Sequence, residues 1–201
     1  MNFAIRDLPL PLRLRTESPM SDEELIRFCA VNDALRVERE PNGELLVMTP
    51  AGMKSGRRNT AIISALDNWA QQDGRGEAFE SNTGFNLPDG SMRSPDAAWV
   101  SAERHDYGLK QEGDGYAPFC PEFVIELRSA SDRLADVETK MEQWMANGAE
   151  LGWLIDPELT QVTQVTIYRA GKEPERLEHP AVVMGDGPVT GFELAMKRIW
   201  S

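Results

Sequence analysis

Three side chains of this sequence have the types and the order that could hold a metal ion and assist a hydrolysis. Asp96 lies in the segment Ser-Pro-Asp-Ala-Ala-Trp-Val, Glu126 lies in Phe-Val-Ile-Glu-Leu-Arg-Ser, and Lys140 follows on a helical pattern. A carboxylate inside an apolar strand is costly unless a partner or a cation compensates it. Two ionised carboxylates on neighbouring strands are donors that Mg²⁺ accepts together with water and substrate phosphate. The pattern therefore predicts a hard-cation site.

A metal ion at such a site would polarise a phosphoryl oxygen and help to generate hydroxide near neutral pH. Lys140, or Arg128 two residues after Glu126, would orient the attacking water or stabilise the charge that develops on phosphorus. The reaction class that these residues predict is hydrolysis of a phosphodiester.

The same residues also have structural interpretations, which the residues alone leave open. Asp96 follows a proline and could cap a turn or pair with Arg93. Glu126 could form a structural ion pair with Arg128 or Lys140. A lysine at the flank of an apolar helix stripe most often extends its ammonium to solvent.

A basic cluster lies near the start of the first long helical pattern. Lys54, Arg57 and Arg58 occur within five residues. Cations close to a helix N-terminus can bind a phosphate, so this cluster is a candidate contact for a nucleic-acid backbone. The alternative is an ordinary solvated helix start.

Local patterns predict three helices. A capping box, Ser21 with Glu24, opens the first, and apolar residues at helical spacing predict a second over 55–72 that ends at Gly74. The third is opened by the capping residue types of 129–132 and stopped by Asn147-Gly148.

Alternating or continuous apolar runs predict the strands. Turn signals at Pro41-Asn42-Gly43 and Pro88-Asp89-Gly90 predict two hairpins. The polar stretch 101–117 reads as a loop, and the strand, helix, strand order of 123–155 predicts a right-handed crossover between parallel strands. Weaker strand signals continue toward residue 200. The predicted strands are 35–40, 44–49, 78–87, 91–100, 123–127, 151–155 and an edge strand over 162–168.

Length and composition set further bounds. The 201 residues fit an extended N-terminal arm over 1–20 and one domain over 21–201. The net charge of −12 opposes non-specific DNA binding, so any DNA contact must be local or assisted by a metal. Cys29 and Cys120 have no zinc-binding or disulfide spacing. No stretch approaches the roughly 20 apolar residues of a membrane span, and the N-terminus has no apolar signal core. We therefore expect a soluble, cytoplasmic protein.

Ordered sequence blocks resemble a known family. The blocks are Leu-Pro-Asp-Gly, Ser-Pro-Asp-Ala-Ala-Trp-Val-Ser, Phe-Val-Ile-Glu-Leu-Arg-Ser-Ala-Ser-Asp-Arg, Lys140, Gly-Trp-Leu-Ile-Asp-Pro and Val-Thr-Ile-Tyr-Arg, spread over 35–169. Together they resemble the Uma-two family of restriction endonucleases, within the PD-(D/E)XK nuclease superfamily. The resemblance implies an α/β fold, restriction-endonuclease-like, with a central mixed β-sheet flanked by helices.

The resemblance also assigns roles to residues. Asp96, Glu126 and the backbone carbonyl of Leu127 would hold the metal ion, and Lys140 would take the role of the superfamily lysine. That lysine usually stands two residues after the second acid, where this chain has Arg128. A guanidinium stays protonated near neutral pH, so it can stabilise charge but is a poor general base. Family members often carry a histidine near the start of the long helix, where this chain has Lys54-Ser55-Gly56-Arg57-Arg58.

The leading prediction is an Mg²⁺-dependent (or Mn²⁺-dependent) endonuclease that hydrolyses DNA, with a homodimer as the simplest way to cut both strands. The rival prediction is a nuclease-fold protein that has lost catalysis and serves as a binding or assembly module, which the acidic balance, Arg128 and the absent histidine favour. A glycoside hydrolase using the same carboxylate pair is a third, less supported alternative.

Overall fold

The computed structural model describes residues 12–32, 35–48, 50–112, 115–158 and 163–201. Most of the predicted arm (1–11), positions 113–114 of the predicted loop, and the predicted strand ends at Thr49 and Val162 lie outside these residues. Within them no helix is both long enough and apolar enough to cross a membrane.

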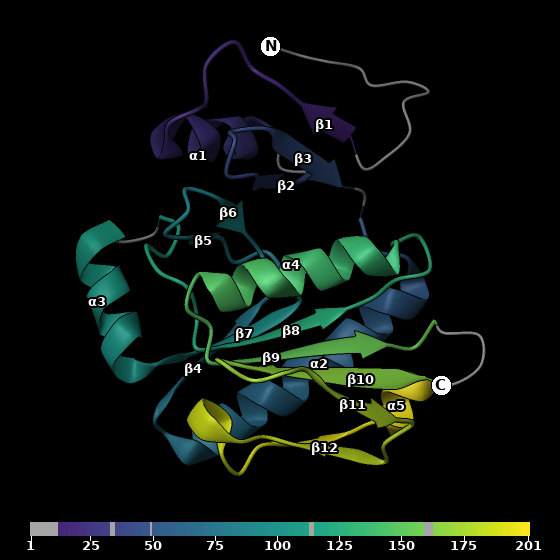
Figure 1. The fold of residues 1–201 in the computed structure, drawn as a ribbon. Coiled ribbons are helices and arrows are strands. Elements are labelled where there is room, and N and C mark those ends of the chain that lie inside the picture. The colour runs from purple at the N-terminus through teal and green to yellow at the C-terminus, as the bar shows by residue number, and fades with distance from the viewer. Residues whose placement is uncertain (1–11, 33–34, 49, 113–114, 159–162) are drawn as a thin grey trace.

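A mixed six-stranded sheet forms the centre of the molecule (Figure 1). Its strand order is β11-β10-β9-β8-β7-β4, in which β8 and β9 are parallel and the other pairs are antiparallel. The strands are β4 (Gly76–Glu80), β7 (Ala97–Ser101), β8 (Phe123–Leu127), β9 (Leu151–Asp156), β10 (Gln164–Arg169) and β11 (Glu175–Glu178).

A second sheet of five shorter strands lies beside the central sheet and carries the N-terminal part of the described chain (Figure 1). Its order is β1-β3-β2-β6-β5, all antiparallel. The strands are β1 (Leu12–Leu14), β2 (Arg36–Arg39), β3 (Leu45–Met48), β5 (Phe85–Asn86) and β6 (Met92–Arg93). The described end of the predicted arm is therefore an edge strand of this sheet.

Helices cover the two faces of the central sheet. The long helix α2 (Met53–Asp73) packs on one face and α4 (Leu134–Ala146) on the other (Figure 1). The remaining elements are α1 (Asp22–Val31), α3 (Ala102–Glu112), α5 (Lys197–Trp200), the 3₁₀ turn η1 (Gly187–Val189) and the two-stranded sheet of β12 (Val182–Met184) and β13 (Glu193–Ala195). This arrangement confirms the predicted fold class.

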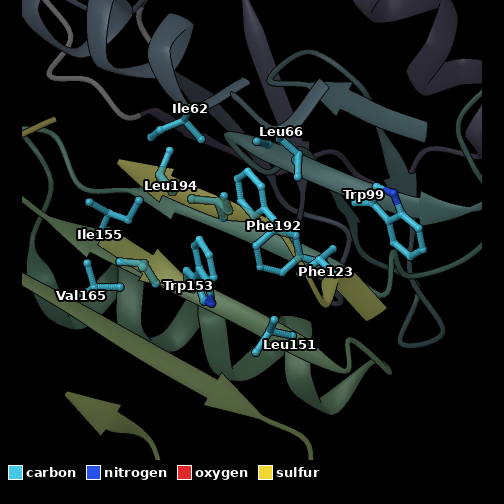
Figure 2. Packing of buried hydrophobic residues seen from close by; sticks show 14 of the residues in the cluster. Ile62, Leu66, Trp99, Phe123, Leu151, Trp153, Ile155, Val165, Phe192 and Leu194 are labelled. Carbon is cyan, nitrogen blue, oxygen red and sulfur yellow. The ribbon is translucent and has the colours of Figure 1, made fainter. Parts of the chain in front are cut away.

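Side-chain alternation along β8 divides the core in two. Phe123 and the alternate residues after it face α2, while Val124 faces α4. On the α2 side the rings of Phe123, Trp153 and Phe192 lie together, with Trp153 and Phe192 stacked at a centroid distance of 5.5 Å (Figure 2). Because successive side chains of a strand point to opposite faces, Glu126 points to the α4 side.

Most predicted elements are confirmed. The capping box at Ser21 is present, with Glu24 bonded to the Ser21 backbone and the Ser21 side chain to the Glu24 backbone. The turn at 41–43 joins β2 to β3, and Gly74 ends α2 with a left-handed φ of 71°. The β8-α4-β9 unit is the predicted parallel crossover.

Two predicted strands each divide between the two sheets. The prediction for 78–87 covers the end of β4 and all of β5, and that for 91–100 covers β6 and most of β7. The predicted hairpin turn is present, since Leu87 N donates to the Ser91 carbonyl. The chain therefore leaves the central sheet after β4, forms β5 and β6 in the smaller sheet, and returns to the central sheet in β7. Alternation along one strand cannot show this change of partner sheet.

The predicted loop 101–117 is wrong over its first part, which is the helix α3. Most of the described side chains of α3 are exposed or half-buried, so no apolar stripe marks the helix in the sequence. Its start is fixed instead by Ser101 Oγ, which accepts from Arg104 N (3.4 Å), and by an Arg104–Glu122 ion pair (3.3 Å).

Two smaller predictions are also wrong. The strand predicted as an edge, β10, lies between β9 and β11, and four of its six side chains are buried. The N-cap of α4 is Arg133, without a side-chain cap. The Asp132 carboxylate instead accepts from Ser129 N (2.8 Å) and Oγ (2.7 Å), which closes a turn before the helix.

Gly76 at the start of β4 tests the packing of the central sheet. A Cβ at this position would meet the Val100 carbonyl oxygen and the Trp99 indole, so we expect Gly76→Ala to lower the free energy of unfolding by about 1–3 kcal/mol through overpacking. Gly56→Ala in α2 is the control, because a Cβ there meets nothing within 4 Å, and it should stabilise the helix by about 0.5–1 kcal/mol. Urea unfolding measures both, and equal free energies of unfolding for the two variants would contradict the close packing around Gly76.

Candidate functional site

Asp96 lies at the point where the chain enters β7, beside the end of β8. Its backbone N–H donates to the Ile125 carbonyl at 3.0 Å, and Ala97 faces the same residue in the strand register. Its carboxylate Oδ2 accepts from the backbone N–H of Leu127 at 2.7 Å. The side chain of Asp96 therefore occupies the edge of β8 next to Glu126.

Two polar side chains hold the other oxygen of Asp96. Asn59 of α2 donates to Oδ1 at 3.1 Å, and Arg36 Nη1 of β2 lies 3.6 Å from the same atom. Arg93, the partner considered from the sequence, instead bonds to Glu38 and Glu40. The structural alternative of an Asp96–Arg93 pair is therefore wrong.

The backbone of Leu127 faces the same edge. In an antiparallel ladder the N–H and C=O of one residue bond to the same neighbouring strand. The Leu127 N–H is taken by the Asp96 carboxylate, so its carbonyl points toward the segment that precedes β7. Pro95 in that segment has no amide hydrogen to offer. The carbonyl of Leu127 is thus available as a donor beside Asp96.

Glu126 is buried, with 4% of its surface exposed, on the face of β8 that packs against α4. Its Oε1 accepts from Trp144 Nε1 at 2.8 Å and lies 2.9 Å from Lys140 Nζ. Burial raises the pKa of Glu126 to about 7, against the opposing effect of the Lys140 ammonium, and the negative charge of Asp96 adds to the rise. Asp96 and Glu126 are placed on adjacent parts of the same strand end, because the Asp96 carboxylate accepts from the backbone N–H of Leu127, the residue that follows Glu126.

Lys140 lies on α4 with its ammonium directed into the protein rather than to solvent. Nζ donates to Glu38 Oε1 at 2.8 Å and to the Ser94 carbonyl at 3.0 Å, in addition to the Glu126 contact. Burial acts to lower the pKa of Lys140, but the charges of Glu126 and Glu38 outweigh it, so the pKa is raised. The side chain is therefore an ammonium near neutral pH.

Glu38 is a site residue that the sequence analysis missed. It comes from β2 in the smaller sheet and is 1% exposed, yet its carboxylate lies within 3.1 Å of Arg93 Nη1 and 2.8 Å of Lys140 Nζ. Burial alone would raise its pKa, but the charges of Lys140, Arg93 and Arg36 dominate and lower the pKa to about 2. Glu38 is thus an ionised carboxylate at the centre of three cations.

Arg36 was also missed. Its Nη2 donates to the Ser94 carbonyl at 2.6 Å and lies 3.9 Å from Glu38 Oε1, while Nη1 reaches Asp96. The segment Arg36-Val-Glu-Arg39 carries three charged residues within one strand, which was the available signal. Surface strands commonly carry such charges, so the pattern does not distinguish a buried ionic site.

Arg128, which the sequence analysis predicted to assist catalysis, is held by the residues around it. Its Nη1 pairs with both carboxylate oxygens of Asp156 (3.0 and 3.1 Å), and its Nε donates to the Asp132 carbonyl. These bonds fix Arg128 at the ends of β8 and β9 and explain why it does not form the structural ion pair with Glu126 considered above.

The basic cluster at the start of α2 is not a single surface. Arg57 bonds to the carbonyl and side chain of Ser201, whereas Arg58 is 1% exposed and pairs with Glu158 at 2.5 Å. The Arg58 hydrogen bond and charge lower the pKa of Glu158, to which the charge of Lys54 contributes. Among the residues that the structure describes, Lys54 is exposed and has no ion pair, and the phosphate contact itself stays a prediction.

The oxygen donors of this site determine which metal ion it could hold. In the ranges that the structure describes, no group of three or more His, Cys, Asp and Glu side chains comes together to bind one. The available set is smaller: the carboxylates of Asp96 and Glu126 with the Leu127 carbonyl. All three are oxygen donors, and Mg²⁺ is usually bound by one or two carboxylates while it keeps several waters. The residues therefore fit this ion and do not fit a full protein cage.

The opposite pKa shifts predict the pH dependence of stability. A carboxyl whose pKa is raised to about 7 contributes stability below its usual pKa near 4.5 and loses it as the pH rises to 7. For Glu126 this loss is on the order of 3 kcal/mol, since one pKa unit corresponds to about 1.4 kcal/mol. We therefore expect the difference in the free energy of unfolding between Glu126→Gln and wild type to change in favour of the variant as the pH rises from 5 to 8.

Urea unfolding at both pH values measures this effect. The exposed Glu142 of α4 provides the control variant Glu142→Gln, which should follow wild type at both. The lowered pKa of Glu38 acts in the other direction, so its contribution is present above pH 4.5 and disappears as the pH falls toward 2. If the difference in the free energy of unfolding between wild type and Glu126→Gln does not depend on pH, the raised pKa assigned to Glu126 is wrong.

Comparison with solved structures confirms the fold. The crystal structure of "a putative nuclease belonging to DUF820" from Anabaena variabilis matches with a TM-score of 0.69, over 90% of this chain and 98% of that chain, at 20% sequence identity. At this identity the likeness concerns the fold. Among curated proteins none matches the sequence.

Comparison with family models gives a match over residues 22–197, which is most of the chain. The matching model is Uma2, described as "Putative restriction endonuclease". The resemblance seen in the sequence blocks is confirmed: the chain belongs to the Uma2 family.

Proposed function

We propose that this protein is an endonuclease that depends on a divalent cation, Mg²⁺ or Mn²⁺, and hydrolyses DNA phosphodiester bonds. The observation that carries the proposal is the placement of the two acids along β8. The Asp96 carboxylate accepts from the Leu127 N–H at 2.7 Å, and Glu126, the residue before Leu127, has its carboxylate 2.9 Å from the Lys140 ammonium. Membership of a family described as restriction endonucleases supports the same reaction.

In the proposal Asp96, Glu126 and the Leu127 carbonyl hold the cation. When bound, the cation would polarise a phosphoryl oxygen and lower the pKa of a water molecule. Asn59 keeps the Asp96 carboxylate in place by donating to Oδ1. Trp144 does the same for Glu126 through its indole N–H. Both carboxylates are thus oriented by neighbours from the two helices that cover the sheet.

Lys140 serves in this proposal as a positive charge and a hydrogen-bond donor. Because its pKa is raised, the amine carries a proton near neutral pH and cannot accept another. It can donate to a phosphate oxygen or to the attacking water and stabilise the negative charge that develops on phosphorus. Arg128, which is held by Asp156, contributes positive charge nearby rather than proton transfer.

The substrate would approach from the side where Arg36 and Lys54 offer positive charge. Arg36 is a quarter exposed and lies beside Asp96. Lys54 stands in the first turn of α2, the helix that carries Asn59. Lys54 is exposed and suited to direct phosphate contact, whereas Arg36 offers its charge while bonded to the Ser94 carbonyl. Arg57 and Arg58 are engaged with Ser201 and Glu158. Two copies acting together would be the simplest way to cut a duplex.

The rival function is a nuclease-fold module without catalysis, and one observation favours it. Arg36, Lys140 and Arg93 already compensate the acids of the site, so the network is complete as a set of structural ion pairs. Calorimetry discriminates the two functions, because the rival predicts that neither Mg²⁺ nor Mn²⁺ binds at millimolar concentration.

Plasmid cleavage tests the proposed activity. With Mg²⁺ or Mn²⁺ we expect wild type to cut the plasmid and Asp96→Asn and Glu126→Gln to lose activity by about 100-fold or more, because each removes a charged oxygen donor. Glu142→Gln, which changes an exposed acid on α4, should cut like wild type. Equal rates for all four proteins would exclude this site as the source of cleavage.

A further inference from the structure

The Glu38 carboxylate connects the two sheets at the site. Oε1 accepts from Lys140 Nζ on α4 (2.8 Å) and from Ser94 N (3.3 Å), and Oε2 accepts from Arg93 Nη1 (3.1 Å). Ser94 is two residues before Asp96 in the sequence. A single buried carboxylate from β2 thus contacts the lysine of the site and the segment that carries its first acid.

The contacts of Lys140 show why it needs a second anion. An ammonium has three N–H donors. Two of those of Lys140 are donated to Glu38 (2.8 Å) and to the Ser94 carbonyl (3.0 Å), and Glu126 Oε1 lies 2.9 Å from Nζ as an ion pair. A Glu126 carboxylate that serves as a metal ligand gives up part of its attraction for the ammonium. Glu38 and the Ser94 carbonyl would then be the contacts that keep the amine in place.

The peptide groups of Ser94 are held on both sides. Its N–H donates to Glu38, and its carbonyl accepts from Lys140 and from Arg36 Nη2 (2.6 Å). Pro95 follows, and the residue before a proline is restricted to extended conformations. Little freedom remains between this fixed point and Asp96.

We propose that Glu38 is the positioning residue of the site, which holds the Lys140 ammonium beside Glu126 and fixes the segment that presents Asp96. This inference rests on the proposed nuclease function for its chemical purpose. A buried ion pair is a weak source of stability, because desolvation offsets most of the attraction. Glu38 therefore contributes mainly by holding Lys140 and the Asp96 segment in place, as is common for groups that orient the donors around a metal site.

The side-chain ammonium signals of the lysines give a direct test that does not require activity. The chain has five lysines, and Lys140→Met identifies the signal of Lys140 by its loss in ¹⁵N-resolved NMR spectra. In Glu38→Gln we expect the hydrogens of Lys140 to exchange with water about 10- to 100-fold faster than in wild type, the factor for losing one charged hydrogen bond. An unchanged exchange rate in a folded Glu38→Gln protein would overturn the proposal.

Glu40 provides the matched control. It follows β2 closely and pairs with Arg93 (2.6 Å), as Glu38 does, but its hydrogen bonds go to Arg13 and Arg93 rather than to Lys140 or Ser94. Glu40→Gln should leave the exchange of the Lys140 hydrogens within about twofold of wild type. If it accelerates exchange as much as Glu38→Gln does, the effect arises from Arg93 and the proposal is wrong.

Activity adds a second readout that a purely structural role would not produce. We expect Glu38→Gln to lower kcat for plasmid cleavage by about tenfold or more, while KM for the plasmid and Kd for Mn²⁺ change by less than about threefold. Comparable losses in kcat, KM and Mn²⁺ binding would indicate general disruption and contradict the proposal.

The experiments distinguish failure of the proposed nuclease function from failure of the role proposed for Glu38. If wild type neither binds Mn²⁺ nor cuts the plasmid, the proposed nuclease function is wrong, and the NMR comparison still decides whether Glu38 places Lys140. If thermal denaturation shows that Glu38→Gln does not fold, Glu38→Asp takes its place. That variant keeps the charge but shortens the reach by one methylene, so the hydrogens of Lys140 should again exchange faster than in wild type.

Discussion

The burial of two carboxylates around one ammonium is the interaction on which the rest of the site depends. Glu38 and Glu126 are each less than 5% exposed, and both contact Lys140 Nζ. Buried charge is tolerated when it is paired and hydrogen-bonded, and removal of one partner is severely destabilising. The position of α4 is therefore tied to both sheets by charge as well as by apolar packing.

The two carboxylates respond to this shared cation in opposite ways. Three cations lower the pKa of Glu38 to about 2, whereas burial and the charge of Asp96 raise that of Glu126 to about 7. One acid thus remains ionised at any physiological pH, and the other exchanges its proton near neutrality. A permanently charged group is suited to orienting a lysine, while a carboxylate that forms one ion pair among the described residues, with Lys140, is suited to binding a metal ion. The division of roles in the proposed mechanism follows from these environments.

The architecture explains how distant parts of the chain meet. The central sheet supplies Glu126 and the approach to Asp96, its covering helices supply Lys140, Trp144 and Asn59, and the smaller sheet supplies Glu38 with the arginines around it. The crossing of the chain between the sheets, from β4 to β5 and from β6 to β7, brings β2 against the site. Family membership and the shared fold agree with this arrangement, and the reaction itself is the proposal made above.

The sequence by itself determined the local elements and the order of acid, acid and lysine. The capping box, the turns at Gly43 and Gly90 and the β8-α4-β9 crossover depend on residues close together in the chain, so their spacing carries the information. Helix α3 was missed because it has no buried apolar stripe.

Only the tertiary structure decided which charges compensate one another. Glu38 and Lys140 are 102 residues apart, and their contact exists because the smaller sheet docks beside α4. Arg128 pairs with Asp156 because two parallel strands end side by side. Ion pairs act through space over a few ångströms, whereas sequence patterns report neighbours along the chain, so the partners of buried charges emerge only once the sheets are packed.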